Sequence, residues 1–296
     1  MGVPVVFALA CAIVYGVADY CGGRASRSAA SATVSLVGQA TSLILGLVVV
    51  VVMGTRLPAA HDLAWGATAG VASAVALSAF YHALSHGAMT VVAPITAVTS
   101  AALPVAVGLF AGERPRVSAF IGMGLAVLAV ALVSGAVGSR REHTAPSTVL
   151  LALLAGVGFA VIFVALDRTS SVSGVWPLVA SRSVSVLLVG AFVLATTGQQ
   201  RRSADSPCGV AGTAPPSRMW HLAMLAGLLD MSANGLYLLA AHRGLLSVIV
   251  VVVALYPVST VCLAFGLDQE RVSKSQALGM VLAVGALILV SVGGAS

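Results

Sequence analysis

Residues 112–127 read GERPRVSAFIGMGLAV, and residues 269–284 read QERVSKSQALGMVLAV. The two stretches belong to a longer ungapped match of residues 69–134 with residues 226–291, in which 19 of 66 positions are identical. Apolar composition alone gives some identities, but it does not give a Glu-Arg pair followed by the same Gly-Met spacing. Because an internal repeat fixes the architecture of a chain, we predict two copies of one structural half.

The composition is that of a protein embedded in lipid. Hydrophobic residues make up 59% of the 296 residues and charged residues 8%, whereas a soluble domain carries about 25% charged residues. The net charge of +6 comes from basic residues set between apolar runs, without the basic stripe and interleaved aromatics of a nucleic-acid interface. We therefore expect a multi-pass membrane protein, with lipid and no nucleic acid as partner.

Ten apolar segments are long enough to cross a bilayer, which takes about 20 residues in a helix. They are apolar on all sides, unlike the alternating ten-residue strands of a membrane barrel. The predicted fold is therefore all-α, with transmembrane helices at about 3–21, 30–53, 63–85, 89–111, 117–137, 147–166, 175–197, 219–241, 245–266 and 276–293.

The ten segments divide into two halves, residues 1–138 and 147–296, joined by a linker at 139–146. Five spans per half is an odd number, so the second copy enters the membrane from the opposite side. We therefore predict two inverted five-helix repeats, an arrangement common in secondary transporters, which bind solute near the midplane between the repeats.

The basic residues of the loops bear on which side of the membrane the N-terminus lies. With a cytoplasmic N-terminus, five basic residues fall on the cytoplasmic side and nine on the other, which by the positive-inside rule favours the opposite orientation. Labelling of single cysteines placed in loops 139–143 and 167–173, in sealed vesicles, distinguishes the two orientations.

Ionisable residues inside a span cost about 2.5–3.5 kcal/mol to insert and are functional candidates for that reason. Asp230 lies in the middle of the eighth span, with Asn234 and Tyr237 four and seven positions later, on the same helix face. A carboxylate, an amide and a phenol on one stripe suit a polar or cationic solute, or a coupled proton. A structural cluster of hydrogen bonds between helices is the competing interpretation.

Two further ionisable residues lie within predicted spans. Asp19 lies toward the end of the first span, one turn after Tyr15. The pair is expected to line the mouth of a central cavity. The alternative is that Asp19 lies at headgroup level and pairs with Arg24. Arg182 in the seventh span corresponds to Gln39 in the first half, which suggests a polar seam between the repeats. Arg182 is expected to neutralise Asp230 or attract an anionic solute.

Other polar positions are given structural roles. Glu113-Arg114 and Glu270-Arg271 lie in repeated turns, where a carboxylate stabilises a nearby helix N-terminus. His82 and His86 have the i, i+4 spacing of metal ligands, but a third ligand is missing, so no metal site is predicted. Tyr81 beside them is expected to be an aromatic anchor at the membrane interface. Pro257 interrupts the ninth span, and Tyr256 beside it is a further candidate for solute contact.

On these features the chain resembles the drug/metabolite transporter superfamily, in particular the EamA family. The resemblance rests on the two five-helix halves, the Gly112–Pro115 turn followed by Gly122-Met123-Gly124, and the first span around Tyr15 and Asp19. It implies cytoplasmic termini and a cavity lined by spans 1, 3, 4, 6, 8 and 9, with spans 5 and 10 at the periphery. Members move amino acids, sugars, nucleotides or drugs by proton coupling, exchange or facilitated diffusion.

The sequence therefore predicts a secondary transporter, a monomer or homodimer, that exports a small metabolite or drug-like solute by alternating access. It contains no P-loop motif for ATP, and neither a cofactor nor catalysis is expected. Uptake of a sugar or amino acid is the alternative within transport. Outside transport, an intramembrane enzyme acting on lipid-linked substrates lacks the acids and bases it needs, and a channel does not require inverted halves. Proton coupling is a hypothesis that rests on Asp230.

Overall fold

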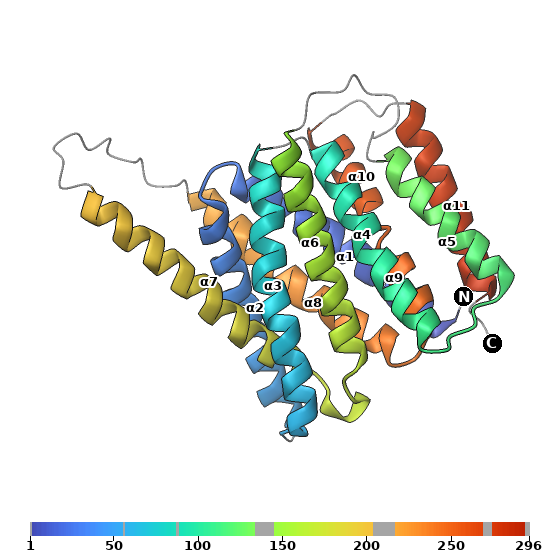
Figure 1. Cartoon of the computed structure of the whole chain (residues 1–296), viewed down its shortest axis with the longest axis horizontal. Coiled ribbons are helices and arrows are strands. Elements are labelled where there is room, and N and C mark those ends of the chain that lie inside the picture. Colours follow the sequence, from blue (N-terminus) through green and yellow to red (C-terminus); the bar gives the residue numbers. More distant parts are fainter. Residues whose placement is uncertain are drawn as a thin grey trace.

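The structure, a computed structural model, describes residues 2–55, 57–86, 89–133, 145–203, 217–268 and 274–293. These residues form α-helices joined by short connections, with one 3₁₀ turn at Ser171–Ser173 and no strand among them (Figure 1). The helices are α1 (Val3–Ser26), α2 (Ser31–Met53), α3 (Ala60–His86), α4 (Met89–Phe110), α5 (Val117–Val133), α6 (Pro146–Asp167), α7 (Trp176–Ser203), α8 (Ser217–Ala241), α9 (Leu246–Val253), α10 (Tyr256–Asp268) and α11 (Lys274–Gly293).

Six described helices are long and apolar enough to cross a membrane, namely α1, α2, α3, α6, α7 and α8. Four further apolar helical stretches are shorter: Ile95–Phe110, Val117–Leu132, Leu246–Thr260 and Ala277–Leu289. The predicted all-α membrane class is therefore confirmed.

The outer faces of these helices are apolar. Val51, Phe110 and Leu187 are 77%, 93% and 71% exposed, and many other large aliphatic residues share this position. A soluble monomer rarely exposes contiguous apolar surface of this extent. Hydrocarbon solvates such side chains without cost, so the surface suits a bilayer and not water.

The helices of the two halves are interleaved. Helix α1 of the first half packs on α8 of the second half, and α3 of the first half packs on both α6 and α7 of the second half. In addition, α2 packs on α7 and α8, and α4 on α6 and α9, while α1 also contacts α9 and α10. Helices α5 and α11 pair with each other at one end of the molecule, and α7 lies at the other end (Figure 1).

Small residues allow these helices to approach closely. A methyl group added at Gly227 of α8 would collide with the backbone of Gly38 in α2, and one added at Gly70 of α3 would collide with the backbone of Ser181 in α7. Between membrane helices, close packing of backbones replaces the hydrophobic effect as the source of association. The two glycine contacts bring the polar faces of α2, α3, α7 and α8 together at the centre of the bundle.

The predicted ninth span, 245–266, is not one helix. It divides into α9, which ends at Val253, and α10, which begins at Tyr256. Pro257 has no backbone N–H to continue the helical ladder, so the helix breaks at Ala254-Leu255 and restarts with proline in its first turn. The predicted interruption at Pro257 is confirmed. As a result, Tyr256 is the first residue of α10 and does not continue α9.

The repeated turn residue Glu113 has the predicted structural role. Its two carboxylate oxygens accept hydrogen bonds from the backbone N–H groups of Leu246 (2.7 Å) and Ser247 (3.0 Å) at the start of α9. Gly112 precedes it with φ 95°, a left-handed conformation that glycine adopts without strain. The first half thus caps a helix of the second half. Glu270-Arg271 lie outside the described residues.

Candidate functional site

A cavity lies at the centre of the bundle, between the two halves. Helices α1, α3 and α4 of the first half and α6, α8 and α10 of the second half line it. The cavity volume is about 40 Å³, within about 490 Å³ of space between the lining atoms that includes the part open to solvent. The lining residues are Tyr15, Ala18, Asp19, Leu77, Phe80, Tyr81, Ser100, Phe159, Phe163, Asp230 and Tyr256.

Asp230 in the cavity lining forms an ion pair with Arg182 behind it. Arg182 Nη2 lies 2.7 Å from Asp230 Oδ2, and the arginine side chain is 3% exposed while that of the aspartate is 17% exposed. The pair joins α7 to α8. A charge in a poorly solvated interior requires a partner, so the expectation that Arg182 neutralises Asp230 agrees with the observed contact.

Polar side chains of the first half extend the ion pair into a network. Arg182 Nη1 donates to Ser73 Oγ at 2.7 Å, and Ser73 in turn donates to Gln39 Oε1 at 3.4 Å. Ser42 lies 3.2 Å from the Asp230 carboxylate and 2.5 Å from the carbonyl of Gly227. The predicted polar seam between Gln39 and Arg182 is thereby present, and it passes through Ser73, the residue that the repeat aligns with Asp230.

Asp19 lines the same cavity but, unlike Asp230, is not paired with any described arginine. No described residue forms a hydrogen bond or ion pair with its carboxylate. Arg24, the alternative partner suggested by the sequence, donates to Tyr20 Oη at 2.9 Å and lies over the Tyr20 ring. The cavity therefore holds one carboxylate that is neutralised by arginine and one that is not.

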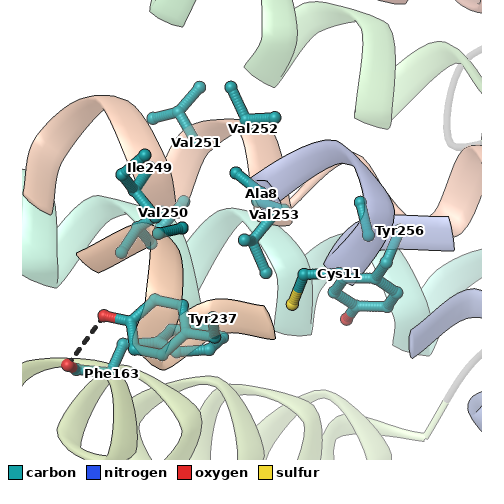
Figure 2. Packing of buried hydrophobic residues seen from close by; sticks show 14 of the residues in the cluster. Ala8, Cys11, Phe163, Tyr237, Ile249, Val250, Val251, Val252, Val253 and Tyr256 are labelled. Atoms are coloured by element: carbon teal, nitrogen blue, oxygen red, sulfur yellow. Dashed lines mark hydrogen bonds between the residues drawn. The ribbon is translucent and has the colours of Figure 1, made fainter. Parts of the chain in front are cut away.

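Aromatic rings form most of the remaining wall. Phe80 stacks edge-on against Phe159 with ring centroids 5.7 Å apart, and Tyr81 follows at 5.9 Å from Phe80. Tyr256 begins α10, and its hydroxyl is buried without a hydrogen-bond partner among the described residues. Figure 2 shows Tyr256 beside Cys11 of α1.

The structure does not bring the whole predicted stripe of α8 to the cavity. Asn234 is buried behind Asp230 and donates to its Oδ1 at 3.2 Å and to its carbonyl at 2.8 Å. Tyr237 is fully buried, and its hydroxyl donates to the carbonyl of Phe163 at 2.8 Å (Figure 2). Both side chains therefore support the site from outside its lining, whereas Tyr15, Asp19, Asp230 and Tyr256 line it.

Sequence reasoning missed four of the six aromatic residues of the lining, Phe80, Tyr81, Phe159 and Phe163. Tyr81 was expected at the membrane interface, but it is 6% exposed and faces the cavity. Phe159 and Phe163 are four residues apart on α6, a signal that identifies one helix face but not what that face meets. Among the described residues no group of three His, Cys, Asp or Glu side chains could hold a metal ion.

Comparison with known proteins gives a family and a fold. Residues 146–292 match the EamA-like transporter family. No curated protein matches the chain. The solved crystal structure of a protein that is 15% identical is similar over 97% of this chain and 98% of its own, with a TM-score of 0.74. At that identity the likeness shows the fold alone, and it extends through both halves.

Proposed function

We propose that the protein is a secondary transporter that exports small metabolites or drug-like solutes across the bacterial cytoplasmic membrane, because residues 146–292 match the EamA-like transporter family. The observation that carries this proposal is the central cavity, which both halves line and which contains two carboxylates. Ionisable residues within membrane spans mark solute or ion pathways.

The ten-span inverted repeat is part of the proposal. Its support is a symmetry in the most extensive helix contacts: these contacts are conserved when α1 is exchanged with α6, α2 with α7, α3 with α8, α4 with α9 and α10, and α5 with α11. The pair α1–α8 becomes α6–α3, and α2–α8 becomes α7–α3. Two equivalent halves with residues 1–138 and 147–296 can rock about the cavity between them, which is the geometry of alternating access.

We assign proton coupling to Asp19, in place of Asp230, on which the sequence-based hypothesis rested. Arg182 and Asn234 contact the Asp230 carboxylate, whereas Asp19 has no such partner among the described residues. The other titratable groups on the cavity wall are Tyr15, Tyr81, Tyr256 and Asp230 itself. In proteoliposomes with an imposed pH gradient, Asp19→Asn is expected to remove gradient-driven transport. Full retention of that transport would exclude Asp19 as the coupling site.

Metabolite profiling of the growth medium tests the transport function itself. Cells that overproduce the protein are expected to release a defined subset of solutes, and cells that lack it are expected to release less of the same subset. Depletion of a nutrient from the medium by overproducing cells would support uptake instead. Identical profiles in the two strains, with the protein verified in the membrane, would contradict transport of metabolites in either direction.

A further inference from the structure

The cavity lining contains acidic groups and no basic ones. Its carboxylates are Asp19 and Asp230, and Arg182 behind the wall neutralises Asp230. Asp19 therefore has no cationic partner among the described residues. A buried carboxylate is stabilised when it binds a proton or when a cation lies beside it, so this lining favours cations over anions.

The rest of the wall selects among cations. Six of the lining residues are aromatic: Tyr15, Phe80, Tyr81, Phe159, Phe163 and Tyr256. The face of an aromatic ring attracts an organic cation at about 6 Å, and the ring also packs against an apolar body. Among the described residues no group of three His, Cys, Asp or Glu side chains could hold a metal ion, so the wall suits an organic cation better than a metal cation.

Tyr256 adds an unsatisfied polar group. Its side chain is 7% exposed, and its hydroxyl oxygen is buried without a hydrogen-bond partner among the residues that the structure describes. A buried hydroxyl without a partner destabilises the free protein. A solute that carries an N–H group next to its charge would pair with this oxygen and with the Asp19 carboxylate.

We propose that the cavity binds monovalent organic ammonium ions with an aromatic body, with Asp19 as the counter-charge, the ring-lined wall as the receptor for the body and Tyr256 as a hydrogen-bond partner. This assignment of solute class rests on the proposed transport function. It goes beyond that function because a cavity of the same size with a basic lining would select anions.

Binding of four matched probes to the purified full chain tests this inference. The probes are 1-naphthylmethylammonium, the neutral 1-naphthylmethanol, the anionic 1-naphthylacetate and the ring-saturated decahydro-1-naphthylmethylammonium, measured by equilibrium dialysis against protein-free micelles. The aromatic cation is expected to bind at least about tenfold more tightly than each of the others, a difference that corresponds to about 1.4 kcal/mol. Equal or tighter binding of the neutral or anionic probe would overturn the assignment.

Two substitutions locate the binding. Asp19→Asn is expected to weaken binding of the aromatic cation at least about tenfold and to leave the neutral probe unchanged. Asp167→Asn makes the same chemical change at the end of α6, outside the cavity lining, and is expected to alter neither. Thermal unfolding of each variant shows whether it is folded. Tyr256→Phe is a second test and is expected to weaken binding of the aromatic cation less than Asp19→Asn does. Cation binding within twofold of wild type in folded Asp19→Asn would refute the assignment.

Binding and export can fail separately. Protein-dependent export of anionic or neutral solutes, without selective cation binding, would overturn the solute class and leave the transport function standing. Selective cation binding in a protein whose overproduction and deletion give identical medium profiles, with aromatic ammonium ions supplied to the cells, would overturn the transport function and leave the binding site standing.

Discussion

Replacing Arg182 with methionine is expected to lower the free energy of unfolding by about 3–5 kcal/mol, the usual loss when one partner of a buried ion pair is removed. Methionine fills much of the same volume but leaves the Asp230 carboxylate without its cation. It also removes the donor to Ser73, a residue that is fully buried in α3. Denaturant titration in detergent, with helical content followed by circular dichroism, measures the change.

Two controls separate this loss from a general effect of losing an arginine. Arg168→Met removes an exposed arginine after α6 and is expected to change stability by less than about 1 kcal/mol. Adding Asp230→Leu to Arg182→Met removes the orphaned charge and is expected to recover most of the loss. A loss below about 1 kcal/mol for Arg182→Met alone would mean that water reaches the pair and that the polar network does not join the two halves.

Filling the cavity is expected to abolish export. Ser100 lies in α4, lines the cavity and is 1% exposed. Ser100→Phe places a ring in the space that a solute would occupy, whereas Ala102→Phe adds the same ring two residues later on the exposed side of α4. Medium profiling is expected to show loss of the protein-dependent solutes for the first variant and their retention for the second.

Equal export by the two phenylalanine variants would contradict a pathway through this cavity. The amount of each variant in the membrane is measured in parallel, because overpacking of a helix interface costs about 1–3 kcal/mol. A second filling substitution, Ala18→Leu on α1, repeats the test from another helix of the lining with a smaller change in volume.

Much of the fold is predictable from the sequence because its signals are local. Charged breaks and apolar runs fix the helices, and Glu113 is identifiable as a capping residue because a carboxylate in a repeated turn has few other roles. The sequence does not reveal that Glu113 caps α9 in the other half. That partner depends on how the halves interleave, which is a tertiary property.

The candidate site is predictable only where polarity is costly. Asp19, Asp230 and Arg182 are conspicuous because charge is rare in a span, and all three take part in the cavity or its network. Phe80 and Phe159 give no such signal, because an aromatic residue of a membrane helix can face lipid, the packed core or a cavity. Tyr237 shows the limit of periodicity: it shares a helix face with Asp230 but lies two turns away, against α6.

The central claim is that this cavity opens alternately to the two sides of the membrane, and cysteine accessibility tests it without knowledge of the solute. Ser100→Cys is introduced after Cys11, Cys21, Cys208 and Cys262 are replaced by alanine, and sealed vesicles of both orientations are treated with a charged, membrane-impermeant thiol reagent. The expected result is that the cysteine at position 100 is labelled by reagent added on either side of the membrane. Labelling from one side alone, or from neither side in folded protein, would contradict the account.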